Sequence, residues 1–100
     1  MIVRILRTRV RKERAHQVRE RALAKLEAAR RVDGLLDARL MAQAGPVDHA
    51  FVFISRWVSM DPLYGWAGGK DLLARPIYFA GLEDFLLEFD IQHYLEIEPA

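Results

Sequence analysis

The side chains best suited to chemistry lie in the second half of the chain. His93 carries an imidazole that titrates near neutral pH and can take a proton from a phenol or a quinol. Trp57, Trp66, Tyr64 and Tyr78 add aromatic surfaces and two hydroxyl groups within a short stretch of sequence. Because glycines interrupt this stretch, it does not read as one simple helix. We therefore expect an aromatic pocket in this part of the fold, with His93 on its floor.

The wall of this pocket is expected to stand away from the body of the domain. Gly65, Gly68 and Gly69 let the backbone leave a regular helix early. Arg75 follows shortly afterwards and is placed at the rim. A guanidinium there can hold a substrate carboxylate with two parallel hydrogen bonds. Substrate contacts are thus expected from a cation as well as from aromatic rings.

Each of these residues also has a purely structural interpretation. Trp57 ends a strand, where a large aromatic side chain stabilises a core through the area that it buries. His93 lies among apolar residues, a common setting for a hydrogen-bonded core histidine. Tyr64 and Tyr78 fit a surface position, and Trp66 fits simple packing. The sequence leaves both interpretations open for every residue of the set.

Composition narrows the class of protein. The 100 residues, 52% of them hydrophobic, suit a single domain over residues 1–100. The absence of cysteine excludes disulfides and thiolate metal sites. His16 and His49 are expected to be solvated, and the three histidines lack metal-site spacing, so neither a metal nor a cofactor is expected. No stretch resembles a signal peptide or reaches transmembrane length, so we expect a cytoplasmic protein without membrane contacts.

The charges are unevenly distributed along the chain. Residues 1–31 contain eleven Lys and Arg against three Glu, a net of +8, while the remainder carries −7. A basic helix can indicate a nucleic-acid interface, but no aromatic residue is interleaved as a stacking platform, so no nucleic-acid partner is expected. Instead, the acidic closing strand is expected beside the basic first strand. That arrangement brings Glu96 and Glu98 near Arg4, Arg7 or Arg9.

Hydrophobic periodicity predicts alternating strands and helices. The expected elements are a strand over 2–10, a helix from residue 13 that Gly34 ends, strands over 36–42 and 49–58, a short helix capped by Asp61, short helical pieces near 71–74 and over 82–89, and a strand over 91–97, with a Gly45-Pro46 turn before the third strand. This order is the βαββαβ pattern of the ferredoxin-like α+β class. It implies a four-stranded antiparallel sheet with helices on one face and the last strand beside the first.

The third strand predicts a partner. Phe51, Phe53 and Trp57 occupy one of its faces, and Val52 and Ile54 occupy the other. A strand that is apolar on both faces is covered on both faces. The helices of so small a domain cover one face, so we expect a second copy of the chain to cover the other, which gives a homodimer.

Several of these motifs together resemble the antibiotic biosynthesis monooxygenase-like family. They are Arg56-Trp57, Trp66-Ala67-Gly68, Ala74-Arg75-Pro76-Ile77-Tyr78 and His93-Tyr94. The resemblance implies a dimeric α+β barrel formed by two βαββαβ subunits. Some members oxidise polycyclic aromatic or quinol-like substrates with O₂ and neither metal nor flavin. The haem-degrading branch is a weaker match, because it uses an asparagine and this chain has none.

The combined expectation is a cofactor-independent monooxygenase-like protein for a small aromatic or quinol-type substrate. His93 is its expected catalytic residue. The expected substrate-binding residues are Trp57, Tyr64, Trp66, Arg75 and Tyr78. Two alternatives share the same fold: a non-catalytic module that binds small molecules, and a structural dimer whose pocket is filled by its own side chains.

Overall fold

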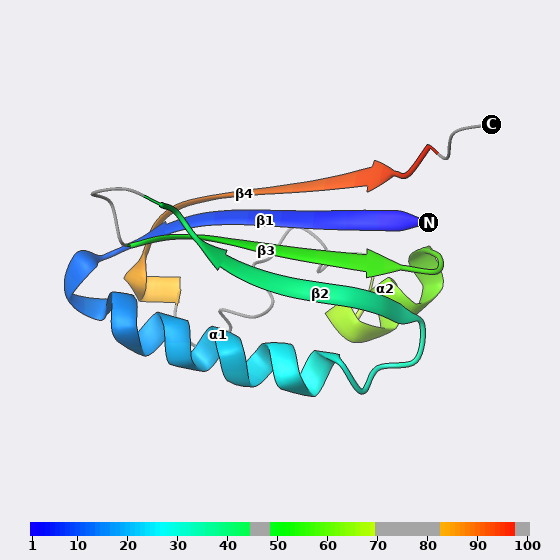
Figure 1. Cartoon of the computed structure of the whole chain (residues 1–100), viewed down its shortest axis with the longest axis horizontal. Helices are drawn as coiled ribbons and strands as arrows, with labels where there is room; N and C mark the ends of the chain where they lie inside the picture. The colour runs from blue at the N-terminus through cyan, green and yellow to red at the C-terminus, as the bar shows by residue number, and fades with distance from the viewer. Residues whose placement is uncertain (45–48, 70–82, 98–100) are drawn as a thin grey trace.

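One antiparallel sheet of four strands is covered on one side by two helices in the computed structural model (Figure 1). The structure describes residues 1–44, 49–69 and 83–97. Its elements are β1 (Ile2–Val10), α1 (Ala15–Ala29), β2 (Leu35–Ala42), β3 (Ala50–Trp57), α2 (Met60–Ala67) and β4 (Leu86–Leu95), with 3₁₀ turns at Lys12–Arg14 and Glu83–Phe85. The strand order β2-β3-β1-β4 places the last strand beside the first and confirms the expected ferredoxin-like arrangement. Within the described ranges, no helix is long and apolar enough to cross a bilayer.

Strand alternation divides the sheet into two unlike faces. The side that carries the helices, here the covered face, receives Leu6 and Val10 from β1 and Phe51 and Phe53 from β3, all nearly inaccessible. The register keeps these side chains in rows, with Leu6 opposite Phe53 on one side and Ile91 on the other. Intervening residues point to the other side, here the open face. Both faces of β3 are therefore apolar, but one chain covers only one of them.

The first helix forms along the predicted stripe. Val18, Ala22, Leu26 and Ala29 recur at helical spacing and are buried against the sheet. Gly34 does not end this helix, which stops at Ala29. With φ of +94° it makes the turn into β2, and a Cβ at this position would overlap the ring of Pro62. Close approach, together with a left-handed backbone, accounts for this glycine.

The second helix begins two positions earlier than expected. Ser59, not Asp61, occupies the N-cap position, and neither side chain makes a capping hydrogen bond there. Gly68, with φ of +91°, is the left-handed C-cap that stops the helix after two turns. The expected Gly45-Pro46 turn and the helical piece near 71–74 lie outside the described residues.

The prediction of a helix over 82–89 is wrong for the residues of this range that the structure describes. A 3₁₀ turn ends at Phe85, and β4 begins at Leu86, well before the expected start at Ile91. The apolar residues Leu86 and Phe89 suit a helix as well as a strand. The edge of β1 decides between them, because its backbone N–H and C=O groups need partners as far as Val10, which pairs with Leu86.

The basic first strand and the acidic last strand do lie side by side, although the expected pairings differ. Arg7 pairs with Asp90 at 3.6 Å and Arg9 with Glu88 at 3.4 Å. Glu96 instead pairs with Arg56 of β3. Glu98 lies outside the described residues. The pairs of Arg7 and Arg9 join the basic first third of the chain to the acidic remainder and offset part of the charge asymmetry within the fold.

Candidate functional site

A buried arginine and a histidine meet on the covered face at the edge of the sheet. Arg4 of β1 stands opposite Ser55 of β3 and His93 of β4, so the three form one row across three strands. Arg4 is 2% exposed and Ser55 is 1% exposed, while His93 is half-buried. The Arg4 Nη1 atom lies 2.9 Å from the His93 Nε2 atom. This row is polar in a surrounding that is otherwise apolar.

The contact fixes the state of the imidazole. A guanidinium has only N–H donors and no acceptor, so the Nε2 atom of His93 must be the acceptor. A neutral imidazole that accepts at Nε2 carries its proton on Nδ1. Burial lowers the pKa of His93 below its usual 6.5, and the positive charge of Arg4 lowers that pKa further. Both effects keep the ring neutral at physiological pH.

Two tryptophans lie on the same face. Trp57, at the end of β3, is fully buried, and its Nε1–H group donates to the Ser55 hydroxyl at 2.9 Å. Trp66 of α2 is half-buried, with its ring 5.4 Å from that of Trp57 and 6.4 Å from that of Phe53. Ser55 therefore links the tryptophan cluster to the row that contains Arg4 and His93.

The remaining predicted site residues divide into two groups. Tyr64 lies on α2, two residues before Trp66, and is half-buried. Arg75 and Tyr78 lie outside the described residues. The structure thus places Trp57, Trp66, Tyr64 and His93 on the covered side of the sheet, whereas the expected cavity between them involves positions that are not described. No group of three or more His, Asp or Glu side chains suited to a metal ion occurs in the described parts of the chain.

Arg4 is the residue that the sequence analysis missed. Its signal was present, because strict alternation in β1 puts Arg4 on the same face as Leu6 and Val10. Arginine is rarely buried without a specific partner, so a charge at a core-facing position points to a site. The other two histidines differ from His93: His16 is exposed and pairs with Glu20, as expected for a solvated side chain, whereas His49 is half-buried.

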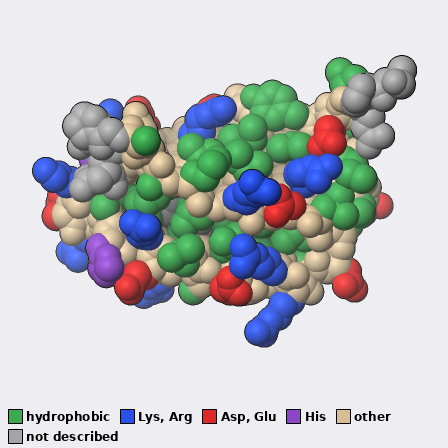
Figure 2. Space-filling model, in the orientation of Figure 1, with side chains coloured by type: hydrophobic (Ala, Val, Ile, Leu, Met, Phe, Trp, Pro, Cys, Tyr) green, Lys and Arg blue, Asp and Glu red, His purple; other side chains and the backbone are tan. Residues whose placement is uncertain are grey.

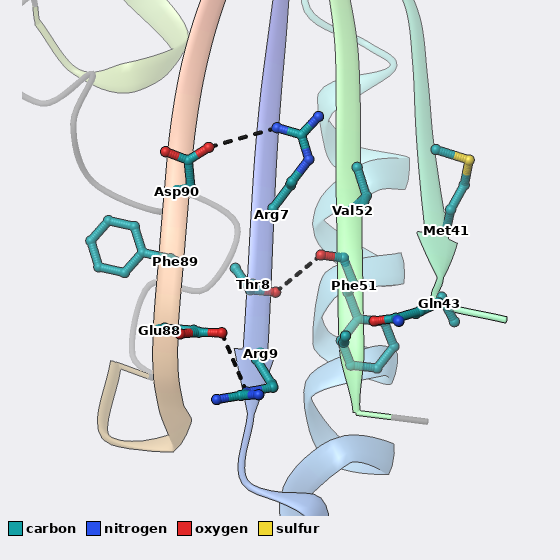
Figure 3. A pocket seen from close by; sticks show the side chains of 12 residues that line it. Arg7, Thr8, Arg9, Met41, Gln43, Phe51, Val52, Glu88, Phe89 and Asp90 are labelled. Atoms are coloured by element: carbon teal, nitrogen blue, oxygen red, sulfur yellow. Dashed lines mark hydrogen bonds and ion pairs between the residues drawn. The ribbon is translucent and has the colours of Figure 1, made fainter. Parts of the chain in front are cut away.

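A hollow formed by described residues lies on the opposite side of the sheet. It has a volume of about 720 Å³ and opens where the end of β1 meets the ends of the other strands. Figure 3 shows Arg7 directed toward Asp90 and Arg9 toward Glu88 at this place. These four side chains are all about half exposed or more, from 49% to 65%. Among the other lining residues are Met41, Gln43 and Val52.

The hollow offers recognition rather than chemistry. Each of its two arginines already faces a carboxylate, and no histidine lines it. Figure 2 shows hydrophobic side chains gathered over the sheet, with basic and acidic groups scattered among them. Such a mixed, nearly neutral surface suits contact with another protein surface better than catalysis. The chemically distinctive site is therefore the row on the covered face.

Comparison with solved structures identifies the same fold elsewhere. An antibiotic biosynthesis monooxygenase family protein from Deinococcus radiodurans superposes with a TM-score of 0.83 at 15% identity, over 100% of this chain and 96% of that one. Rv0793 from Mycobacterium tuberculosis gives 0.80 at 20% identity, over 99% and 97%. PA3566 from Pseudomonas aeruginosa gives 0.80 at 18% identity, over 97% and 94%. At these identities the likeness establishes the fold.

Family membership comes from the sequence itself. No curated protein matches the chain at a significant level. The family model described as antibiotic biosynthesis monooxygenase matches residues 1–74, which include β1 with Arg4 and the whole tryptophan cluster. Because this match covers most of the chain, the protein belongs to the antibiotic biosynthesis monooxygenase family.

Proposed function

We propose that this protein is a cofactor-independent monooxygenase-like enzyme that acts on a small aromatic or quinol-type substrate. The observation that carries the proposal is the neutral His93, which lies on the same face of the sheet as Trp57 and Trp66. An aromatic substrate gains area and ring contacts from tryptophan. A half-buried imidazole beside it contacts a substrate oxygen and stabilises the charge that develops there.

The proposed reaction needs only O₂ as its second substrate. A phenol with a free ring position becomes a quinone when one oxygen atom of O₂ bonds to that ring carbon. The second oxygen atom leaves as water, together with the hydrogen of that ring position and the hydrogen of the hydroxyl group. The substrate supplies the electrons. The protein has to orient the ring, lower the cost of ionising the hydroxyl and exclude bulk water. The proposed substrate contacts are Trp57, Tyr64, Trp66, Arg75 and Tyr78.

We also infer that two copies pair through the open face. Val52 and Ile54 of β3 lie on this face beside Val3 and Ile5 of β1. The arginines that share the face pair with carboxylates of their own chain, so a second copy meets a surface with little net charge. Covering such apolar strands with an identical sheet completes a barrel, as the family resemblance implies. The hollow of about 720 Å³ then lies between the two sheets.

Oxygen uptake with a panel of phenols and quinols of one to three rings tests the activity. His93→Gln is the informative variant, and His16→Gln is its matched control because His16 lies exposed on α1. We expect O₂ consumption in step with quinone absorbance in the wild type and the control. The His93→Gln rate should fall by about a hundredfold, as for loss of a group that stabilises charge on the reacting oxygen.

Three other outcomes have different meanings. Ligand binding without O₂ consumption would identify a non-catalytic binding module. Neither binding nor uptake would leave a structural dimer with a self-filled interior. Equal rates in the wild type and in His93→Gln would remove His93 from the catalytic machinery.

A further inference from the structure

The two neighbours of the His93 ring are not equivalent. On the Nε2 side stands the buried guanidinium of Arg4. His93 is only half-buried, so part of its side chain stays accessible. Among the described residues, the contact with Arg4 is the hydrogen bond that this ring makes. The Nδ1 atom is therefore the ring nitrogen available to a ligand.

The proton on Nδ1 determines what that ligand atom must be. A nitrogen that bears hydrogen donates and does not accept, so it faces an acceptor oxygen. Arg4 strengthens the donor, because a hydrogen bond accepted at one ring nitrogen polarises the N–H bond at the other. The ring also stays neutral, so this donor does not compete with Arg4 as a second charge.

We propose that Arg4 is a positioning residue that holds His93 in the Nδ1–H tautomer, so that the site receives its substrate through an acceptor oxygen, an ionised phenol or enol or a quinone-type carbonyl. This inference rests on the proposed function for the location of the substrate. In this arrangement His93 acts as the donor that stabilises negative charge on the substrate oxygen. Substrates with an acidic hydroxyl are preferred over weakly acidic phenols, because the ring does not accept the proton at the nitrogen that it presents.

The chain contains its own control for the tautomer. The Nε2 atom of His16 lies 3.1 Å from a carboxylate oxygen of Glu20, which can only accept. His16 must therefore carry a proton on Nε2, whereas His93 must not. One protein thus contains two histidines whose Nε2 atoms face opposite kinds of partner.

Long-range ¹H–¹⁵N correlation spectra of histidine-labelled protein at about pH 7.5 test the proposed tautomer of His93. We expect His93 to show a protonated Nδ1 and an unprotonated Nε2, and His16 to show a protonated Nε2. Arg4→Met should abolish this preference at His93 and leave His16 unchanged. Arg4→Lys, which retains a cationic donor, should restore it. A protonated Nε2 on His93 in the wild type would overturn the inference, whatever activity the enzyme has.

Ligand titration tests whether the ligand meets His93 through an acceptor oxygen. Both tryptophans of the chain belong to the cluster, so quenching of their fluorescence reports binding at this place. The probes are lawsone, a hydroxynaphthoquinone that is ionised at neutral pH, and its uncharged methyl ether. We expect His93→Phe to weaken lawsone binding by about tenfold and the ether by clearly less, as for loss of a charge-assisted hydrogen bond.

The results separate this inference from the proposed activity. Equal loss for both probes, or none for lawsone, would overturn the assignment of an acceptor oxygen. The predicted tautomer and lawsone binding without any oxygen uptake would instead reject the monooxygenase activity and retain the site chemistry. Arg4→Met should match His93→Phe in its effect on lawsone, while Arg4→Lys should bind lawsone within about threefold of the wild type.

Discussion

The two faces of the sheet use arginine in opposite ways. On the open face, Arg7 and Arg9 of β1 each lie near a carboxylate of β4 and remain half exposed. On the covered face, Arg4 of the same strand is buried and donates to a histidine. Three positions along one strand thus separate a solvated ion pair from a buried polar row.

The physical reason is the change of medium. Exposed ion pairs contribute little, because water screens them and the long side chains lose entropy. Burial lowers the pKa of His93, and the guanidinium of Arg4, which keeps its charge when removed from water, lowers that pKa further. The charges of the open face therefore neutralise one another, which suits a surface that packs against another. On the covered face, the charge of Arg4 acts on His93.

The largest expected effect comes from removing the fully buried tryptophan of the covered face. Trp57→Ala should lower the free energy of unfolding by about 3–5 kcal/mol, because Trp57 is fully buried and its ring contacts Trp66. Tyr94→Ala is the counterpart on the open face, where Tyr94 is 47% exposed. In an isolated subunit it should cost less than about 0.5 kcal/mol.

Denaturant unfolding at two protein concentrations measures both values. If a second copy covers the open face, the cost of Tyr94→Ala should increase at the higher concentration. Similar costs for both variants in the monomer would contradict the division of the sheet into a covered and an open face.

The next effect concerns association through the open face. Ile54 stands between Ile5 and Arg39 in the register of the sheet. Ile54→Glu places a carboxylate beside Arg39, where a monomer tolerates it, but a dimer would have to bury it. We expect the dissociation constant to rise by roughly a hundredfold. Light scattering after size exclusion at micromolar concentration should then give the mass of a single chain.

Leu23→Glu is the matched control for this change. Leu23 is a large apolar residue that is 44% exposed, but it lies on α1, away from the open face. This variant should retain the mass of two chains. A wild type that elutes as a monomer, or equal dissociation by both variants, would argue against pairing through the open face.

The sequence predicted the elements whose patterns match their surroundings. The alternation in β3, with Phe51 and Phe53 against Val52 and Ile54, predicted the strand and its two apolar faces. The spacing of Val18, Ala22, Leu26 and Ala29 likewise predicted the buried stripe of α1. Local pattern was not sufficient at Leu86 and Phe89, since their spacing suits a helix and only the hydrogen-bonding demand of the neighbouring β1 makes them a strand.

The site was predicted less completely for a related reason. Single residue types suggested His93, Trp57 and Trp66, which the structure brings to one side of the sheet. The pairing of Arg4 with His93 joins residues 89 positions apart and depends on the register between β1 and β4. Sequence spacing does not contain that information. Arg75 and Tyr78 remain predictions, because they lie outside the described residues.

The smallest expected effect is a pH dependence that belongs to His93. Its pKa is lowered in the folded chain, first by burial and then by the charge of Arg4, while the unfolded chain titrates near 6.5. As pH falls through 6.5, His93 therefore becomes protonated in the unfolded state while it stays neutral in the folded state. The stability that this histidine contributes is complete above 6.5 and is lost as pH falls toward the lowered folded pKa.

His93→Gln isolates this contribution, because the amide oxygen of glutamine can still accept from Arg4 but does not titrate. Between about pH 7.5 and about pH 5.5, the wild type should lose more unfolding free energy than the variant does. The difference between the two slopes, measured by urea titration at each pH, removes the contributions of His16 and His49. Parallel slopes would show that His93 titrates alike in both states, and a steeper loss in His93→Gln would mean that its folded pKa is raised. Either result would remove the buried Arg4–His93 contact from the covered face and, with it, the main contrast with the solvated ion pairs on the open face.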